Sequence, residues 1–87
     1  MDAMKRRLLL TLAVVTTVRE LHEAPEGPAY AACLGRFPDL TSWEFEQVVQ
    51  SLDKTGAIRR FGHVMRWASN PEWTKICDEA DRIASAS

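Results

Sequence analysis

The stretch Thr41–Ala68, TSWEFEQVVQSLDKTGAIRRFGHVMRWA, decides the fold, because its residue pattern changes from a helical period to two short strands. In its first half, apolar residues recur at intervals of three and four, which predicts a helix with one buried face. These residues are Phe45, Val48, Val49 and Leu52. Thr41 and Glu44 have the spacing of a capping box, so the helix is expected to begin there. Gly56 is expected to end it.

Beyond Gly56 the same stretch predicts a β-hairpin with strands Ala57–Phe61 and Val64–Ala68. Gly62 and His63 join the strands, and glycine at the first position of a two-residue loop is typical of a type II′ turn. The hairpin carries three arginines: Arg59, Arg60 and Arg66. Alternation along a strand places Arg60 on one face of the hairpin and Arg59 on the other.

Two further helices are predicted before this stretch. Residues 3–23 contain no glycine or proline and form the first. Ala24–Pro28 is interpreted as a connection, because its two prolines and one glycine end a helix. A short second helix is expected from Pro28 to about Leu34, ending at Gly35.

The first helix has an apolar arc wider than a surface helix needs. One stripe is formed by Met4, Leu8, Leu12 and Val15, with Leu10, Val14 and Leu21 on one side of it and Leu9 and Ala13 on the other. Two explanations stay open. The helix is either buried both in its own core and against a second subunit, or it lies at the centre of its own domain.

A fourth helix follows the hairpin. Ser69 or Asn70 serves as its N-cap, with Pro71 at the first helical position, and the helix extends to about Ala84. Its predicted apolar stripe consists of Trp73, Ile76, Cys77, Ala80 and Ile83. The three tryptophans, Trp43, Trp67 and Trp73, are interpreted as core or rim anchors rather than as groups that stack on bases.

The length and composition predict one domain, residues 1–87, built around a single modest core. Eleven Lys and Arg against twelve Asp and Glu give a net charge of −1, so any nucleic-acid contact requires a local basic patch.

Cys33 and Cys77 stand far apart among apolar neighbours, and both are interpreted as reduced core residues. His22 and His63 have no partners that suggest a nucleophile and base or a metal site. The expectation is therefore neither an enzyme nor a protein with a cofactor.

The N-terminal KRRLLLTLAVV resembles the basic and apolar regions of a signal peptide. No small-x-small cleavage site follows at the usual distance, and the helical pattern continues through Arg19 and Glu20. The apolar run is also too short to span a bilayer. These features lead us to expect a cytoplasmic protein.

The predicted order is helix, helix, helix, strand, strand, helix, a mainly α fold with a small β-hairpin. With the run LTSWEFEQVVQSLDKTGAIRRFGHVMRW, this order resembles the winged helix-turn-helix domains of bacterial regulators of the MarR and PadR kinds. The chain is also similar to small bacterial proteins with a PEGPAYAACLG-type second helix. The resemblance implies DNA binding and transcriptional regulation, with the third helix in the major groove and the hairpin on the DNA backbone.

The expected contact residues for double-stranded DNA are Thr41, Ser42, Gln47, Gln50, Lys54, Arg59, Arg60 and Arg66. A homodimer through the first and last helices is also expected, since the apolar arc of the first helix is wide. Its expected interface residues are Leu9, Leu10, Ala13, Val14, Trp73, Ile76 and Ile83. Glu44, Glu46 and Asp53 argue against DNA, because carboxylates repel phosphates. If the arginines pair with such acids, the alternative is a winged-helix protein-interaction module without DNA affinity.

Overall fold

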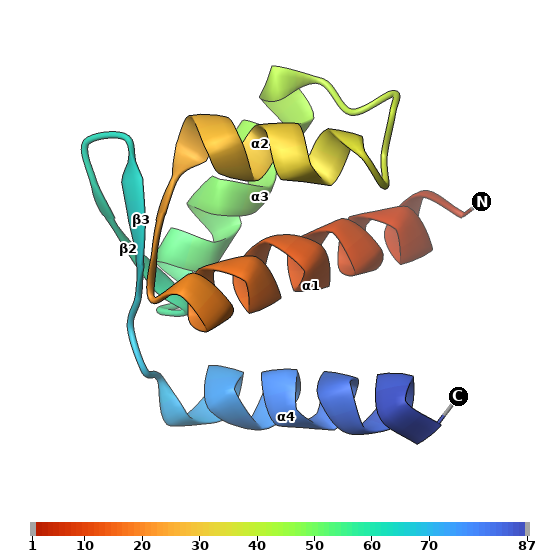
Figure 1. The fold of residues 1–87 in the computed structure, drawn as a ribbon, viewed down its shortest axis with the longest axis vertical. Coiled ribbons are helices and arrows are strands. Elements are labelled where there is room, and N and C mark those ends of the chain that lie inside the picture. The colour runs from red at the N-terminus through yellow and green to blue at the C-terminus, as the bar shows by residue number, and fades with distance from the viewer. Residues whose placement is uncertain (1, 87) are drawn as a thin grey trace.

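The computed structural model describes residues 2–86, which form four helices and one small antiparallel sheet (Figure 1). The mainly helical fold with a β-hairpin is confirmed. In chain order the elements are α1 (Ala3–Leu21), β1 (Glu23–Pro25), α2 (Glu26–Leu34), α3 (Ser42–Lys54), β2 (Ile58–Phe61), β3 (Val64–Trp67) and α4 (Pro71–Ala86). The first and last positions of the predicted domain, 1 and 87, lie outside the described residues.

The sheet contains a third strand that the sequence analysis did not predict. Strand order is β1-β3-β2, and Ala24 of β1 lies opposite Met65 of β3. The prediction that Ala24–Pro28 is a connection without regular structure was therefore wrong. Ala24 is buried within β1, and the strand residues on either side of it are exposed. Pro25 is tolerated because β1 is an edge strand, where one side of the backbone makes no ladder hydrogen bond.

The chain passes from α1 into β1 through His22, whose φ is 65°. A positive φ is uncommon outside glycine, although histidine is among the residues enriched there. The carbonyl of His22 accepts a hydrogen bond from the Trp67 amide at 2.8 Å, which joins the start of β1 to the end of β3. The turn therefore places the sheet directly against the C-terminal end of α1.

Helix α2 begins earlier than predicted, at Glu26 rather than at Pro28. Pro28 lies within the first turn, where a backbone N–H has no partner inside the helix, so proline costs little there. The Tyr30 ring packs edge-on against Phe45, with ring centroids 5.4 Å apart, and its hydroxyl donates to the Leu40 carbonyl at 2.9 Å. Tyr30 thus holds α2 against the start of α3.

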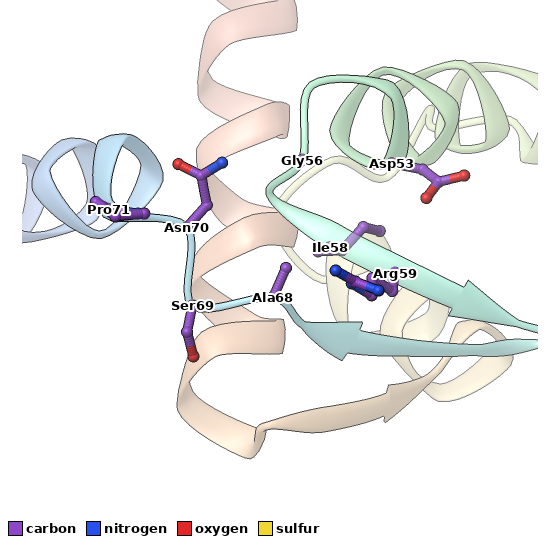
Figure 2. A pocket seen from close by; sticks show the side chains of 8 residues that line it. All are labelled: Asp53, Gly56, Ile58, Arg59, Ala68, Ser69, Asn70 and Pro71. Carbon is purple, nitrogen blue, oxygen red and sulfur yellow. The ribbon is translucent and has the colours of Figure 1, made fainter.

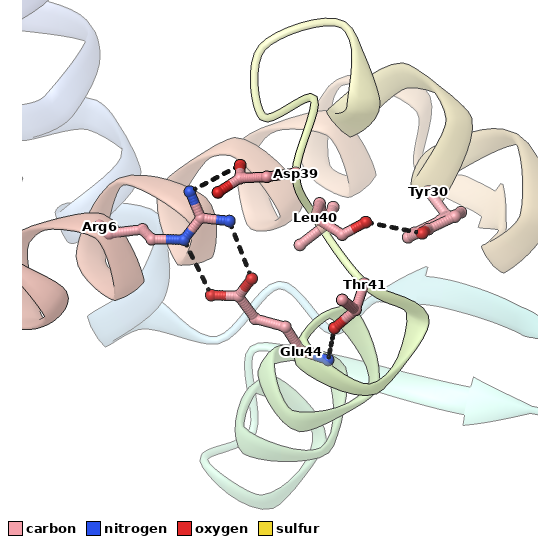
Figure 3. Close-up of polar contacts among 6 residues, drawn as sticks. All are labelled: Arg6, Tyr30, Asp39, Leu40, Thr41 and Glu44. Atoms are coloured by element: carbon pink, nitrogen blue, oxygen red, sulfur yellow. Dashed lines mark hydrogen bonds and ion pairs between the residues drawn. The ribbon is translucent and has the colours of Figure 1, made fainter.

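The start and end of α3 follow the local sequence signals. The Thr41 hydroxyl accepts a hydrogen bond from the Glu44 amide at 3.1 Å, as a capping box requires. The Glu44 carboxylate instead binds Arg6 of α1 (Figure 3). Beyond the helix Gly56 has a φ of 84°, which fits its predicted role as a stop.

The predicted hairpin is also confirmed. Ile58 lies opposite Trp67, and Phe61 lies opposite Val64. Gly62 has a φ of 62°. In a type II′ turn the first loop residue has a positive φ and the second loop residue has a negative φ, so Gly62 has the conformation expected for this turn.

The core lies between α1, α3 and the sheet. Its fully buried side chains include Leu10, Val14, Val15, Val18, Val48, Val49, Leu52, Ile58 and Met65. Helix α1 packs against α2, α3, α4 and the sheet. This central position accounts for most of the wide apolar arc of α1. Within residues 2–86 no helix is long and apolar enough to cross a membrane.

The burial of α1 corrects part of the predicted dimer interface. Leu10, Ala13 and Val14 belong to the chain's own core, so they are not available to a second subunit. Leu9 and Trp73 are partly buried against that core. Of the seven predicted interface residues, only Ile76 and Ile83 are exposed, at 43% and 58%.

Candidate nucleic-acid interface

Helix α3 presents four side chains to solvent at intervals of four, three and four residues. This outer stripe of α3 consists of Trp43, Gln47, Gln50 and Lys54. At about 100° per residue, these positions lie on the side opposite the buried apolar face. Trp43 is 69% exposed, Gln50 and Lys54 are exposed, and Gln47 is half-buried. The stripe offers two amides, one cation and one indole to a partner.

On one flank of the stripe, Glu44 is paired with Arg6 of α1. The Arg6 guanidinium donates from Nε and Nη2 to the two carboxylate oxygens of Glu44 at 3.1 and 2.9 Å, and from Nη1 to Asp39 at 3.0 Å (Figure 3). These hydrogen bonds from Arg6 lower the pKa of Glu44. Glu44 is therefore not an unpaired carboxylate, although Arg6 is shared with Asp39 and the three side chains together carry a charge of −1.

On the other flank, Glu46 is paired with Arg60 of β2. Arg60 donates to both carboxylate oxygens of Glu46, at 2.9 and 3.1 Å, and its Nε donates to Glu26 of α2 at 2.8 Å. The hydrogen bonds from Arg60 lower the pKa of Glu46. One guanidinium thus connects β2, α2 and α3, and fixes the hairpin beside the outer stripe.

The three hairpin arginines separate as strand alternation predicts. Arg60 lies on the core face of the sheet, whereas Arg59 and Arg66 lie opposite each other on the outer face. Arg66 pairs with Glu23 at 2.5 Å and lies over the Phe61 ring at 5.3 Å. Arg59 is exposed and makes no ion pair with any residue in 2–86.

These placements divide the predicted DNA-contact residues into groups. Gln47, Gln50 and Lys54 share one helix face, with Thr41 and Ser42 exposed at its start, although the Thr41 hydroxyl also caps the helix. Arg59 and Arg66 lie on the outer face of the hairpin. The structure does not place Arg60 with them, because it is held inside by two carboxylates.

Trp43 is the residue that the sequence analysis missed. It was interpreted as a core or rim anchor, yet it is 69% exposed. The helical period already placed it with Gln47 and Gln50, on the face opposite Phe45 and Val48. Periodicity was therefore a better guide here than the usual burial of tryptophan.

A shallow depression of about 450 Å³ lies at the base of the hairpin. Its lining residues are Asp53, Gly56, Ile58, Arg59, Ala68, Ser69, Asn70 and Pro71. Figure 2 shows Asp53 and Arg59 on one side, with Ser69 and Asn70 on the other. The side-chain Oδ1 of Asn70 caps α4 by accepting a hydrogen bond from the Glu72 amide at 2.9 Å. Opposite charges at the opening give no net attraction for a charged ligand.

The cysteines are core residues, as predicted. Cys33 and Cys77 are both buried and are not joined by a disulfide. Burial raises the pKa of both thiols, which disfavours the reactive thiolate. Among residues 2–86, no three His, Cys, Asp or Glu side chains are placed to hold a metal ion.

Comparison with known proteins gives no assignment: no protein-family model, curated protein or solved structure matches the chain.

Proposed function

We propose that the chain is a winged-helix domain that binds double-stranded DNA, with α3 in the major groove and the hairpin as its wing. The element order supports this proposal, because α2 and α3 follow one another as a helix-turn-helix would and β2 and β3 come next. The unpredicted strand β1 adds to the support, since it extends the hairpin into a sheet packed on α1. A role in transcriptional regulation in the cytoplasm belongs to the same proposal.

The outer stripe of α3 is the observation that carries the proposal. Carboxylates on a reading helix repel phosphates, but Glu44 and Glu46 are each paired with an arginine from another element. Between them, Gln47 and Gln50 offer amides of the kind that bind adenine in a bidentate manner. Both carboxylates that flank the first two turns of the stripe thus contact a guanidinium, and the exposed Asp53 in the last turn is the flanking carboxylate with no ion pair within residues 2–86.

Contacts to phosphate come from Lys54, Arg59 and Arg66. Lys54 and Arg59 are exposed and make no ion pair within residues 2–86. Arg66 is paired with Glu23, but both side chains are about half exposed, so the pair contributes at most about 1 kcal/mol and exchanges readily for a phosphate. Arg60 positions the wing against α3 instead of touching DNA. Its Ala variant should weaken binding without changing the number of phosphate contacts.

The salt dependence of binding tests this assignment. We expect the affinity for a duplex of about 20 base pairs to fall steeply between roughly 50 and 200 mM salt. Lys54→Ala and Arg59→Ala should each reduce the salt slope by about 1, whereas Arg60→Ala should lower affinity with the slope unchanged. Lys75→Ala removes an exposed cation of α4; it is the control and should leave the slope unchanged. The proposal fails if no duplex binds at low salt.

We also propose that the domain acts as a homodimer. The apolar stripe of α1 is buried at Val15 but exposed at Met4 and Leu8, by 82% and 58%. Helix α4 runs beside α1, and the N- and C-terminal ends of the chain lie at the same end of the molecule (Figure 1). The uncovered apolar half of α1 and the exposed Ile83 of α4 therefore lie at that end, where a second copy can cover them.

A protein-interaction module without DNA affinity is the second candidate. Its support is that two of the three hairpin arginines are occupied by intramolecular carboxylates, in a chain of net charge −1. Trp43 and Phe61 are exposed by 69% and 56%, and aromatic residues are enriched in the energetic centres of protein interfaces. Absence of duplex binding at low salt, in a chain that is folded by circular dichroism, would select this candidate.

A further inference from the structure

Trp43 differs from the other two tryptophans in its surroundings. Trp67 and Trp73 are partly buried against the core. Trp43 is 69% exposed, and within residues 2–86 no aromatic ring or cation packs on its indole. By contrast, the exposed ring of Phe61 in β2 has the Arg66 guanidinium over it, 5.3 Å from the ring centroid. Trp43 thus presents a large apolar surface that its own chain does not use.

The position of Trp43 restricts what that surface can meet. It lies in the first turn of α3 and opens the outer stripe, one turn before Gln47. In helix-turn-helix proteins the N-terminal residues of the reading helix approach the base edges. The two nearby glutamates, Glu44 and Glu46, each contact a guanidinium, so neither is an unpaired carboxylate.

We infer that Trp43 reads thymine through its C5-methyl group, and that the target of the domain is rich in A·T pairs. The thymine methyl is the apolar group that a standard base pair presents in the major groove. Gln47 and Gln50 follow on the same stripe and suit adenine, so both kinds of contact favour the same base pairs. This inference rests on the proposed DNA binding, and it adds the class of sequence that is bound.

Substitution of thymine by deoxyuridine tests the inference directly, because it removes only the methyl group. The probes are duplexes of about 20 base pairs with alternating A·T, alternating A·deoxyuridine or alternating G·C pairs. We expect the wild-type chain to bind the A·T duplex roughly four-fold more tightly than the deoxyuridine duplex for each methyl group that is buried. For Trp43→Ala the ratio should approach one, and Trp43→Phe should keep part of it.

Quenching of tryptophan fluorescence by acrylamide gives a second readout. Trp43 should dominate the quenching of the free chain, because the other two tryptophans are partly buried. The A·T duplex should protect it. Leu21→Ala is the matched control, since Leu21 is 59% exposed at the end of α1 and should not change the ratio between duplexes.

The outcomes separate this inference from the proposed function. If no duplex binds at low salt, the proposed function fails. If duplexes bind but the wild type does not distinguish thymine from deoxyuridine, the reading role of Trp43 is wrong while DNA binding stands. The role is also overturned if Trp43→Ala weakens all three duplexes equally, because the indole would then contact the backbone.

Discussion

At the scale of single residues, Arg6 and Arg60 decide the character of α3. Each binds a glutamate on one flank of the outer stripe, and each comes from a different element. From the sequence, Glu44 and Glu46 counted against DNA because their partners lie 38 and 14 positions away. No local pattern indicates such pairs, so the charge of the site could not be predicted from the sequence.

The same two glutamates make the stability depend on pH. Their pKa values are lower in the folded chain than in the unfolded chain, so their contribution is fully present above the unfolded value of about 4.3. It is lost as the pH falls through the lower folded values. We expect the urea midpoint to fall over this acidic range. Glu46→Gln should lower the midpoint near pH 7 and make the fall shallower.

Circular dichroism during urea titration, from about pH 7 to about pH 3, measures this effect. Glu20→Gln is the control, because Glu20 is exposed and makes no ion pair within residues 2–86. If Glu46→Gln and the wild type lost stability in parallel, the bond to Arg60 would contribute nothing to the pH dependence.

At the scale of elements, the position of a glycine determines whether its replacement by alanine stabilises or destabilises the domain. Gly62 occupies the hairpin loop with a φ of 62°, where an L-residue is strained. Gly27 lies in the first turn of α2, and an added Cβ would meet nothing within 4 Å. We expect Gly62→Ala to destabilise the domain by about 1 kcal/mol or more and Gly27→Ala to stabilise it by about 0.5 kcal/mol.

Thermal unfolding of the two alanine variants compares them under one condition. The expected shifts of the midpoint have opposite signs, downward for Gly62→Ala and upward for Gly27→Ala. Two downward shifts of equal size would mean that α2 needs glycine for a reason other than backbone conformation.

The elements also show where sequence patterns are sufficient. Helix α3 and the hairpin were predicted closely, because the Thr41 cap, the Gly56 stop and the Gly62 turn are local signals. Strand β1 has three residues, too few for an alternation pattern, and its partner β3 is about 40 positions away. It forms because the turn at His22 returns the chain to the sheet, which is a tertiary effect.

At the scale of the whole molecule, the helices leave one end of the fold incompletely covered. Helix α4 buries only Cys77 fully, so it lies on the rest of the fold through a narrow contact. Arg19 of α1 adds a bond to Asp78 at 2.5 Å. At the other end of α1, Ala3, Met4, Arg7, Leu8 and Thr11 line an open depression of about 480 Å³. The sequence showed the apolar arc but not which part of it the chain itself covers.

The depression gives the dimer a specific test. If a second copy covers Met4 and Leu8, a carboxylate at position 8 must be removed from water in the dimer, which costs several kcal/mol and opposes association. We expect sedimentation equilibrium to give twice the mass of the 9.8 kDa chain for the wild type and the monomer mass for Leu8→Glu.

Leu21→Glu is the matched control, because Leu21 is 59% exposed against 58% for Leu8 but lies at the opposite end of α1. It should sediment as the wild type does, since its side chain stays in water in either state. A monomer mass for the wild type at all concentrations would refute the dimer, and equal dissociation of both variants would show that another surface holds it. Because two copies double the number of phosphate contacts on one duplex, Leu8→Glu should also reduce the salt slope of DNA binding by about half, and Leu21→Glu should not.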